Sequence, residues 1–130
     1  MNKRFVLLAA AALTLAAPAA YAKDLVAGAI KEAKTAKGTV LTDAKGMTLY
    51  TFDKDKKGMS ACYDDCAKKW PPLAAAEGAK EMGEFTLVKR KDGTMQWAHE
   101  GMPLYGWQND KKPGDVTGDG VGGVWQVAKD

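Results

Sequence analysis

The sequence is poor in the residue types that most enzymes use for catalysis. It contains one histidine, His99, and two cysteines among its 130 residues. It has no G-x-S-x-G motif and no phosphate-cradling loop of the G-x-x-x-x-G-K-[ST] type, so nucleophilic and phosphoryl-transfer chemistry lack their usual parts. The absence of a C-x-x-C-H motif excludes covalent haem attachment. We therefore expect a protein that is not an enzyme, and the sequence predicts no bound cofactor.

Long apolar runs are also scarce, and the one that exists lies at the start of the chain. A 13-residue apolar run, interrupted by one threonine, follows Lys3 and Arg4 and precedes an Ala-Tyr-Ala sequence that ends at Ala22. These three parts predict a signal peptide over residues 1–22. A membrane-spanning helix needs about 20 apolar residues, so no membrane span is expected. The mature protein is expected to be periplasmic or secreted.

An excess of charge of one sign is missing as well. The chain has 19 Lys and Arg against 16 Asp and Glu, and removal of Lys3 and Arg4 with the signal leaves 17 against 16, a net charge of +1. Binding to nucleic acid by counterion release needs many more unpaired cations, so no nucleic acid partner is expected.

What the sequence does contain is an internal repeat with a spacing of 55 residues. Positions 38–70 and 93–125 share eleven identities, where average composition gives about two by chance. Each copy has a β-prone run, a turn ending in glycine, a second run with alternating large side chains, and a closing tryptophan. This order predicts a β-hairpin in each repeat, over about residues 38–73 and 93–128.

The predicted fold is mainly β, a β-rich α+β domain over residues 38–130. Two pseudo-symmetric hairpin repeats pack together in it with one short helix that carries the cysteines. Residues 84–90 alternate as a strand before a tight turn at residues 91–93, and residues 74–83 are expected to form a loop or short helix. The alanine- and lysine-rich residues 23–37 are expected to form a surface helix or a lead-in.

The two cysteines lie in the segment expected to be helical. Ser60 is expected to cap a helix over residues 61–69, which a Trp-Pro-Pro sequence ends. Cys62 and Cys66 would then lie one turn apart, within reach of a disulfide. An oxidising compartment favours a structural disulfide. A thiol–disulfide exchange pair and a metal-binding thiolate pair are the alternatives.

Both copies fit the pattern Y-x-[FWY]-x-x-D, at residues 50–55 and 105–110. The pattern C-x-x-x-C-A-x-x-W-P-P-L follows the first copy, and a Pro-Gly-Asp segment with a closing tryptophan follows the second. Over about residues 38–128 the chain resembles the bacterial secreted-repeat family of unknown function, which is described as predicted lipoproteins with this motif. The resemblance implies a small, exported, β-rich domain and no established activity.

The repeated motif supplies the candidate ligand-binding residues. They are Tyr50, Phe52, Asp55, Tyr105, Trp107 and Asp110. Their rings and carboxylates suit a flat ligand, but a repeated folding unit also needs aromatic core residues and aspartates that bond turn amides. Trp70 and Trp125 are expected to be structural core residues.

Metal binding is the second site hypothesis. His99 with Met102 suggests copper, because thioethers suit Cu(I), although methionine is also an ordinary core residue. Asp115 and Asp119 lie in a glycine-rich loop that offers oxygen ligands to calcium, without the EF-hand spacing. The expected function is an exported, non-catalytic periplasmic module that binds an unidentified periplasmic protein or small ligand. The alternative is a periplasmic protein that handles copper or redox equivalents.

Overall fold

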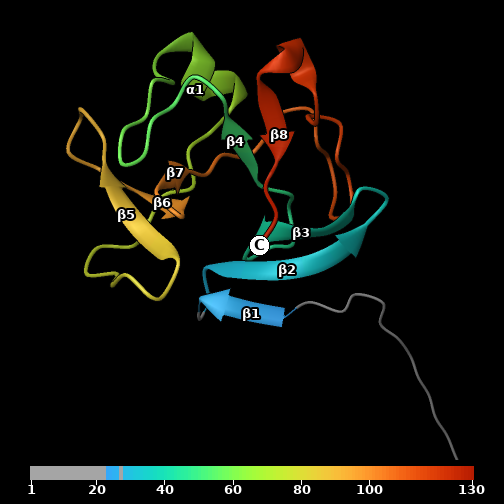
Figure 1. Ribbon diagram of the computed structural model, residues 1–130, viewed down its shortest axis with the longest axis horizontal. Helices are drawn as coiled ribbons and strands as arrows, with labels where there is room; N and C mark the ends of the chain where they lie inside the picture. Colours follow the sequence, from blue (N-terminus) through green and yellow to red (C-terminus); the bar gives the residue numbers. More distant parts are fainter. Residues whose placement is uncertain (1–22, 27) are drawn as a thin grey trace, which may run out of the picture.

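The protein is described by a computed structural model over residues 23–26 and 28–130, so the predicted signal peptide lies outside the described residues. Its strands form three small antiparallel sheets (Figure 1). The first contains β1 (Lys23–Val26), β2 (Ile30–Thr35) and β3 (Gly38–Asp43); the second contains β4 (Tyr50–Phe52) and β8 (Trp125–Val127); the third contains β5 (Phe85–Lys89), β6 (Met95–His99) and β7 (Met102–Pro103). A short helix, α1 (Asp65–Lys69), and a 3-10 turn at Val121–Gly123 follow the two motif copies. The predicted mainly β fold is confirmed.

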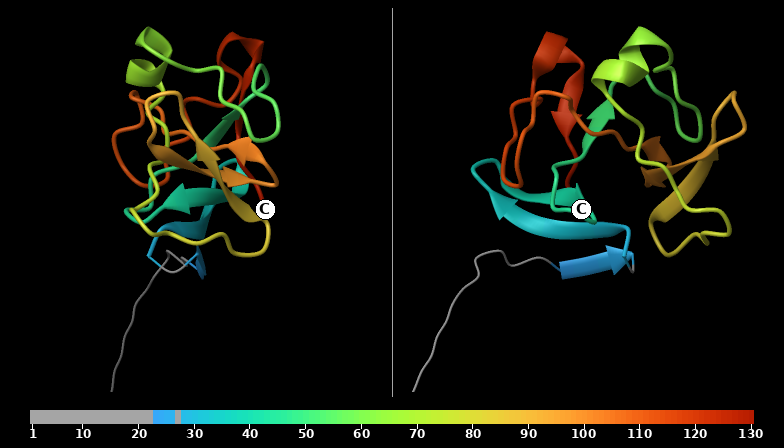
Figure 2. Two further views of the ribbon diagram at one scale, coloured as in Figure 1. Left: turned by 90° about the vertical axis from the view of Figure 1, so that its left-hand side faces the viewer. Right: turned by 180° about the vertical axis from the view of Figure 1, so that it is seen from behind.

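The two halves of the chain have corresponding positions in space. β4 and β8 lie above the β1–β2–β3 sheet and beside the β5–β6–β7 sheet (Figure 1), and α1 and the Val121–Gly123 turn lie at the same end of the molecule in every view (Figures 1 and 2). The predicted strand before residue 91 and the strand after residue 93 are confirmed as β5 and β6, which pair along their whole length. Residues 74–83 form a loop without a helical turn.

The register of the hairpins shows that the two repeats align with a one-residue gap in the hairpin turn. Asp43 bonds through its backbone to Met47, whereas His99 pairs with Met102. Asp43 therefore corresponds to His99, and the turn of the second repeat is one residue shorter. The shorter turn has positive φ at both central residues, Glu100 at 51° and Gly101 at 86°, which is the backbone of a type I′ hairpin turn.

The N-terminal segment differs from its prediction. Instead of a helix or a lead-in, Lys23–Val26 and Ile30–Thr35 form β1 and β2 of the β1–β2–β3 sheet. Val26 and Ile30 are buried on either side of a tight turn, in which the Ala29 amide donates to the Val26 carbonyl at 2.9 Å. Pairing of β2 with every residue of β3 outweighs the helix propensity of alanine and lysine.

The cysteine-bearing helix is shorter than predicted. It covers Asp65–Lys69 and ends before the Trp-Pro-Pro sequence, as expected. Ser60 does not cap it, because its hydroxyl contacts the Tyr105 hydroxyl at 2.6 Å in the interior. Asp64 has a φ of 55°, which turns the chain so that Cys62 enters the core before the helix begins.

Each repeat completes the sheet of the other repeat. After Leu49 the first repeat leaves β3 and pairs as β4 with β8 of the second repeat. Ala128 bonds through its backbone to Leu41 and Leu49, and Leu73 bonds in the same way to Trp97 and Leu104. The segments that follow the two closing tryptophans are thus exchanged between the repeats, so neither repeat has a complete sheet alone.

Candidate functional site

The large aromatic residues of the two repeats form one continuous stack. Phe52 stacks on Trp125 with ring centroids 4.2 Å apart, Trp125 on Trp70 at 3.8 Å, and Trp70 on Trp107 at 3.9 Å. The rings alternate between the first and the second repeat. The stack therefore holds the two halves together, and its members bury most of their surface in the core.

The motif tyrosines connect the repeats by equivalent hydrogen bonds. The Tyr50 hydroxyl donates to Asp110 at 2.6 Å, and the Tyr105 hydroxyl donates to Asp55 at 2.6 Å. The two tyrosines also exchange backbone hydrogen bonds of 2.7 and 2.9 Å. Burial, together with the neighbouring carboxylate, raises the pKa of both phenols, so they stay protonated and act as donors.

The motif aspartates also bond to the backbone of the following loops. Asp55 accepts the Ala61 amide at 2.7 Å, and Asp110 accepts the amide and the hydroxyl of Thr117. Burial raises the pKa of Asp55 above its ordinary value, and the hydrogen bond from Tyr105 opposes that shift. The candidate ligand platform thus lies in the interior, where its polar atoms already have partners. Of its six residues, only Trp107 is half-buried; the other five are buried.

The predicted disulfide between Cys62 and Cys66 is confirmed. The Cα atoms lie 5.2 Å apart, and Cys62 is fully buried against the aromatic stack. The closed disulfide leaves neither sulfur as a free thiolate, which is the form that metal binding requires.

A buried arginine that the sequence reasoning missed lies between the repeats. Arg90, 6% exposed, donates to the Ser60 hydroxyl at 3.0 Å, the Gln96 side chain at 2.9 Å and the Cys62 carbonyl at 2.7 Å. Its guanidinium lies 4.2 Å from the centre of the Tyr63 ring. The run Lys-Arg-Lys is typical of an exposed surface, so nothing in the sequence marked its middle residue as buried.

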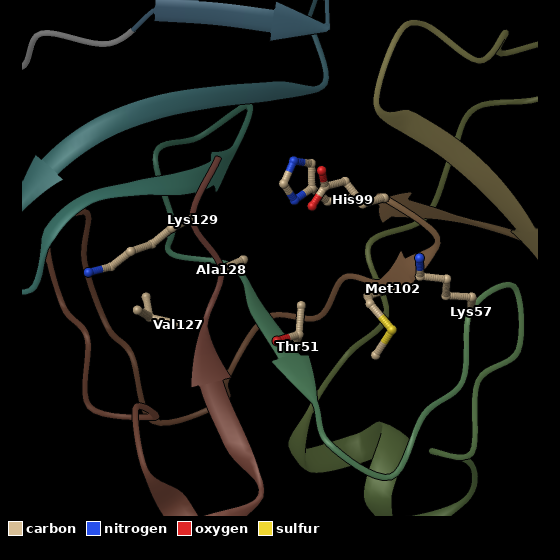
Figure 3. Close-up of a pocket in the computed structure, with 8 residues that line it drawn as sticks. Thr51, Lys57, His99, Met102, Val127, Ala128 and Lys129 are labelled. Atoms are coloured by element: carbon tan, nitrogen blue, oxygen red, sulfur yellow. The ribbon is translucent and has the colours of Figure 1, made fainter.

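A pocket of about 370 Å³ opens between the repeats beside His99 (Figure 3). Its lining comes from the loop after β4, from β4, β6, β7 and β8, and from the residues after β8. The lining residues are Thr51, Lys57, His99, Glu100, Met102, Val127, Ala128 and Lys129. His99 and Met102, the residues of the copper hypothesis, both line this pocket, but the Met102 thioether points away from the imidazole (Figure 3).

His99 lies among carboxylates that are distant in sequence. Its Nε2 atom lies 3.0 Å from Glu84 and 3.2 Å from Asp130. One ligand atom from each of Glu84, His99 and Glu100 falls within 4.8 Å of the others. The pairing of Phe85 with His99 in the β5–β6 hairpin produces this cluster, because it brings the residues beside them together.

The other metal candidates, Asp115 and Asp119, lie outside this cluster and are bonded to other groups of the protein. Asp115 accepts the Lys111 amide at 2.8 Å and the Lys112 ammonium at 2.9 Å. The Lys112 ammonium holds the pKa of the Asp115 carboxyl below its ordinary value. Asp119 accepts the Val127 amide at 3.0 Å and pairs with Lys37. Asp115 therefore stabilises a turn in its own loop, whereas the partners of Asp119 lie in β8 and in the first repeat.

The fold and the pocket define a class of protein, a two-repeat β domain with a shared aromatic core. The profile of a family described as "secreted repeat of unknown function" matches residues 31–74 and 86–129. The chain belongs to this family, which confirms the resemblance carried by its motifs. The matches begin at β2 and β5, earlier than the predicted repeat boundaries. Comparison with curated proteins found no match, and neither did comparison with solved structures.

Within residues 23–26 and 28–130, no helix has the length and apolar character that crossing a bilayer requires.

Proposed function

We propose that the protein is an exported, non-catalytic binding module whose pocket at His99 binds a divalent transition-metal ion. Export is supported by the signal pattern at the N-terminus and by the description of the family as secreted. The observation that carries the proposal is the convergence of Glu84, His99 and Glu100 at one edge of the pocket.

The donor set suits this kind of ion. Imidazole nitrogen and carboxylate oxygen are ordinary ligands of zinc and related metals, at about 2.0–2.2 Å from the ion. The glutamate side chains reach solvent, so small rotations can close the 4.8 Å cluster around an ion. The histidine side chain is only 9% exposed, which fixes one ligand in place. The thioether of Met102 lines the same pocket but points away from the imidazole (Figure 3), so the donor set consists of one imidazole and two carboxylates.

The difference between the repeats supports a dedicated site. In the first repeat Asp43 takes the position of His99, and its carboxylate accepts the Lys45 and Met47 amides of the turn. The shorter turn of the second repeat makes no such demand on His99. Glu100 occupies a left-handed conformation that non-glycine residues adopt rarely, at the point where its side chain joins the cluster.

A binding role agrees better with the pocket than a catalytic one. The residues that line it include no serine or cysteine nucleophile. The proposal departs from the sequence expectation of no cofactor, because sequence reasoning did not bring Glu84 and Glu100 to His99.

Isothermal titration of the tag-free mature chain with Zn(II), Cu(II) and Ca(II) tests the proposal. We expect one saturable site for Zn(II) or Cu(II) and none for Ca(II), which prefers six to eight oxygen ligands. His99→Ala should abolish binding, and Glu84→Gln should weaken it about tenfold. Glu77→Gln removes another exposed carboxylate, which belongs neither to the cluster nor to the lining of the pocket, and should leave the affinity unchanged.

Circular dichroism of each variant separates loss of the site from loss of the fold. Absence of saturable transition-metal binding in the folded wild-type chain contradicts the proposal. Binding that survives His99→Ala also contradicts it.

A further inference from the structure

The interface between the repeats is reciprocal. Each tyrosine of the motif bonds to the aspartate of the other repeat, and Trp70 stacks on Trp125 with ring planes only 2° apart. The segments after these tryptophans are exchanged in the same way. An interface of this kind has the form of a two-fold contact, in which the same surface is used on both sides.

The connection between the repeats contributes little to this interface. Residues 76–84 are largely exposed. Their described hydrogen bonds are mostly local, such as the Ala79 amide to the Ala76 carbonyl at 3.0 Å. The aromatic stack and both tyrosine–aspartate pairs therefore do not depend on the two repeats belonging to one chain.

We infer that the repeat interface is also a binding surface for a second copy of this chain. The first repeat of one copy pairs with the second repeat of the other, and the reverse pairing completes a closed, exchanged dimer. The dimer contains two complete units, each with the contacts of the monomer. This inference is independent of the metal site.

The protein concentration during folding decides whether the monomer or the exchanged dimer forms. A short flexible connection gives the second repeat an effective concentration in the millimolar range. The monomer therefore dominates at micromolar protein, and the exchanged dimer forms when chains fold at much higher local concentration. Because exchange breaks the whole core, dimers formed during folding are expected to persist on dilution.

Arg90 determines which repeats pair. It belongs to the second repeat, and two of its partners, Ser60 and the Cys62 carbonyl, belong to the first. A pair of two second repeats leaves this buried guanidinium without them, which is costly. Thr35 corresponds to Arg90 in the first repeat, so a pair of two first repeats leaves Ser60 without the guanidinium. The surface thus selects a first repeat for a second one.

Complementation between two full-length mature chains tests the inference. One chain carries Tyr50→Arg and Trp70→Arg in its first repeat, and the other carries Tyr105→Arg and Trp125→Arg in its second. Neither chain alone, as monomer or dimer, contains an intact pair of repeats. Refolded together, they can form one intact unit from the second repeat of the first chain and the first repeat of the second chain.

The readouts are molar mass by light scattering and near-ultraviolet circular dichroism of the tryptophans. We expect a species of twice the chain mass with about half the wild-type signal per chain, since one of its two units is intact. Each variant refolded alone at the same total concentration is the control. A mixture whose signal equals the sum of the controls overturns the inference. Adding Arg90→Met to the first chain should lower the yield of the mixed dimer.

Discussion

The hydrogen bond between Tyr50 and Asp110 offers the sharpest test of the shared core. Tyr50→Phe removes the donor to Asp110 at 2.6 Å and the acceptor of the Gly118 amide at 3.1 Å, with little change of shape. A hydrogen bond to a charged group contributes about 1.5–3 kcal/mol. The amide left without a partner adds about 1 kcal/mol. We therefore expect a loss of about 2–4 kcal/mol in the free energy of unfolding.

Equilibrium unfolding in urea, followed by tryptophan fluorescence, measures this loss. The melting temperature should fall by about 8–30 °C, since 1 kcal/mol corresponds to about 4–8 °C in a domain of this size. The transition should stay single with an unchanged slope, because both repeats contribute to one core. Tyr63→Phe is the matched control; its hydroxyl only accepts the exposed Lys91 amide, and its removal should cost under about 0.5 kcal/mol.

A double-mutant cycle with Asp110→Asn separates this contact from other effects of the substitution. A coupling of about 1 kcal/mol or more is expected for groups in direct contact. Two results would refute this reasoning. One is a loss in the free energy of unfolding of Tyr50→Phe that is no greater than that of Tyr63→Phe, and the other is two separate unfolding transitions. Either result means that the repeats do not share one interior.

Three further predictions concern the same core. Trp70→Ala and Trp125→Ala should each lower the free energy of unfolding by about 3–5 kcal/mol, and a loss below about 1 kcal/mol in urea unfolding would mean that the ring is not buried. Gly118→Ala should cost about 1–3 kcal/mol by overpacking, because its Cβ would lie 2.9 Å from both the Trp70 and the Tyr50 ring; calorimetry showing an unchanged melting temperature would contradict this. Burial raises the pKa of Asp55 above 3.8 in the folded state, so its contribution to stability is fully present below pH 3.8 and is lost as the pH rises through the folded pKa. Between pH 3.8 and the folded pKa of Asp55, the free energy of unfolding of the wild type should therefore fall relative to that of Asp55→Asn. Urea unfolding at several pH values measures this difference in free energy, and a difference that is constant with pH would contradict the raised pKa.

Local patterns predicted much of this fold because its turns and aromatic residues recur. Glycine-containing turns and alternating runs located β3, β5 and β6, and the Trp-Pro-Pro sequence located the end of α1. The β1–β2 hairpin was missed, since its alanines and lysines favour a helix and only contact with β3 selects the strand. Residue pattern alone does not contain that contact.

The crossed pairing of the motif also could not be derived from sequence. Tyr50 and Asp55 are five residues apart and invite a contact within one repeat. The structure joins Tyr50 to Asp110 instead, because the backbones of Tyr50 and Tyr105 pair antiparallel and project each side chain toward the opposite loop. Spacing within a motif does not distinguish these two arrangements.

The cluster at His99 was within reach of sequence reasoning. The predicted hairpin has its turn at residues 91–93, and counting outward along both strands brings Glu84 opposite the His99–Glu100 pair. The sequence reasoning paired His99 only with its neighbour Met102, so the carboxylates were missed. Arg90 gave no such signal, because burial of one residue in a basic run depends on packing between the repeats.

The differences between the repeats separate folding from function. Positions that match, such as Tyr50 with Tyr105 and Trp70 with Trp125, have all their partners in the core and are explained by the two-fold interface. Replacing a matching residue should therefore change stability first. His99 does not match its counterpart: Asp43 bonds a turn that the second repeat has shortened, whereas His99 packs beside the Phe85 ring and contacts Glu84 and Asp130. Substitution there should leave the fold intact and change binding, so stability and metal affinity should respond to different sets of residues.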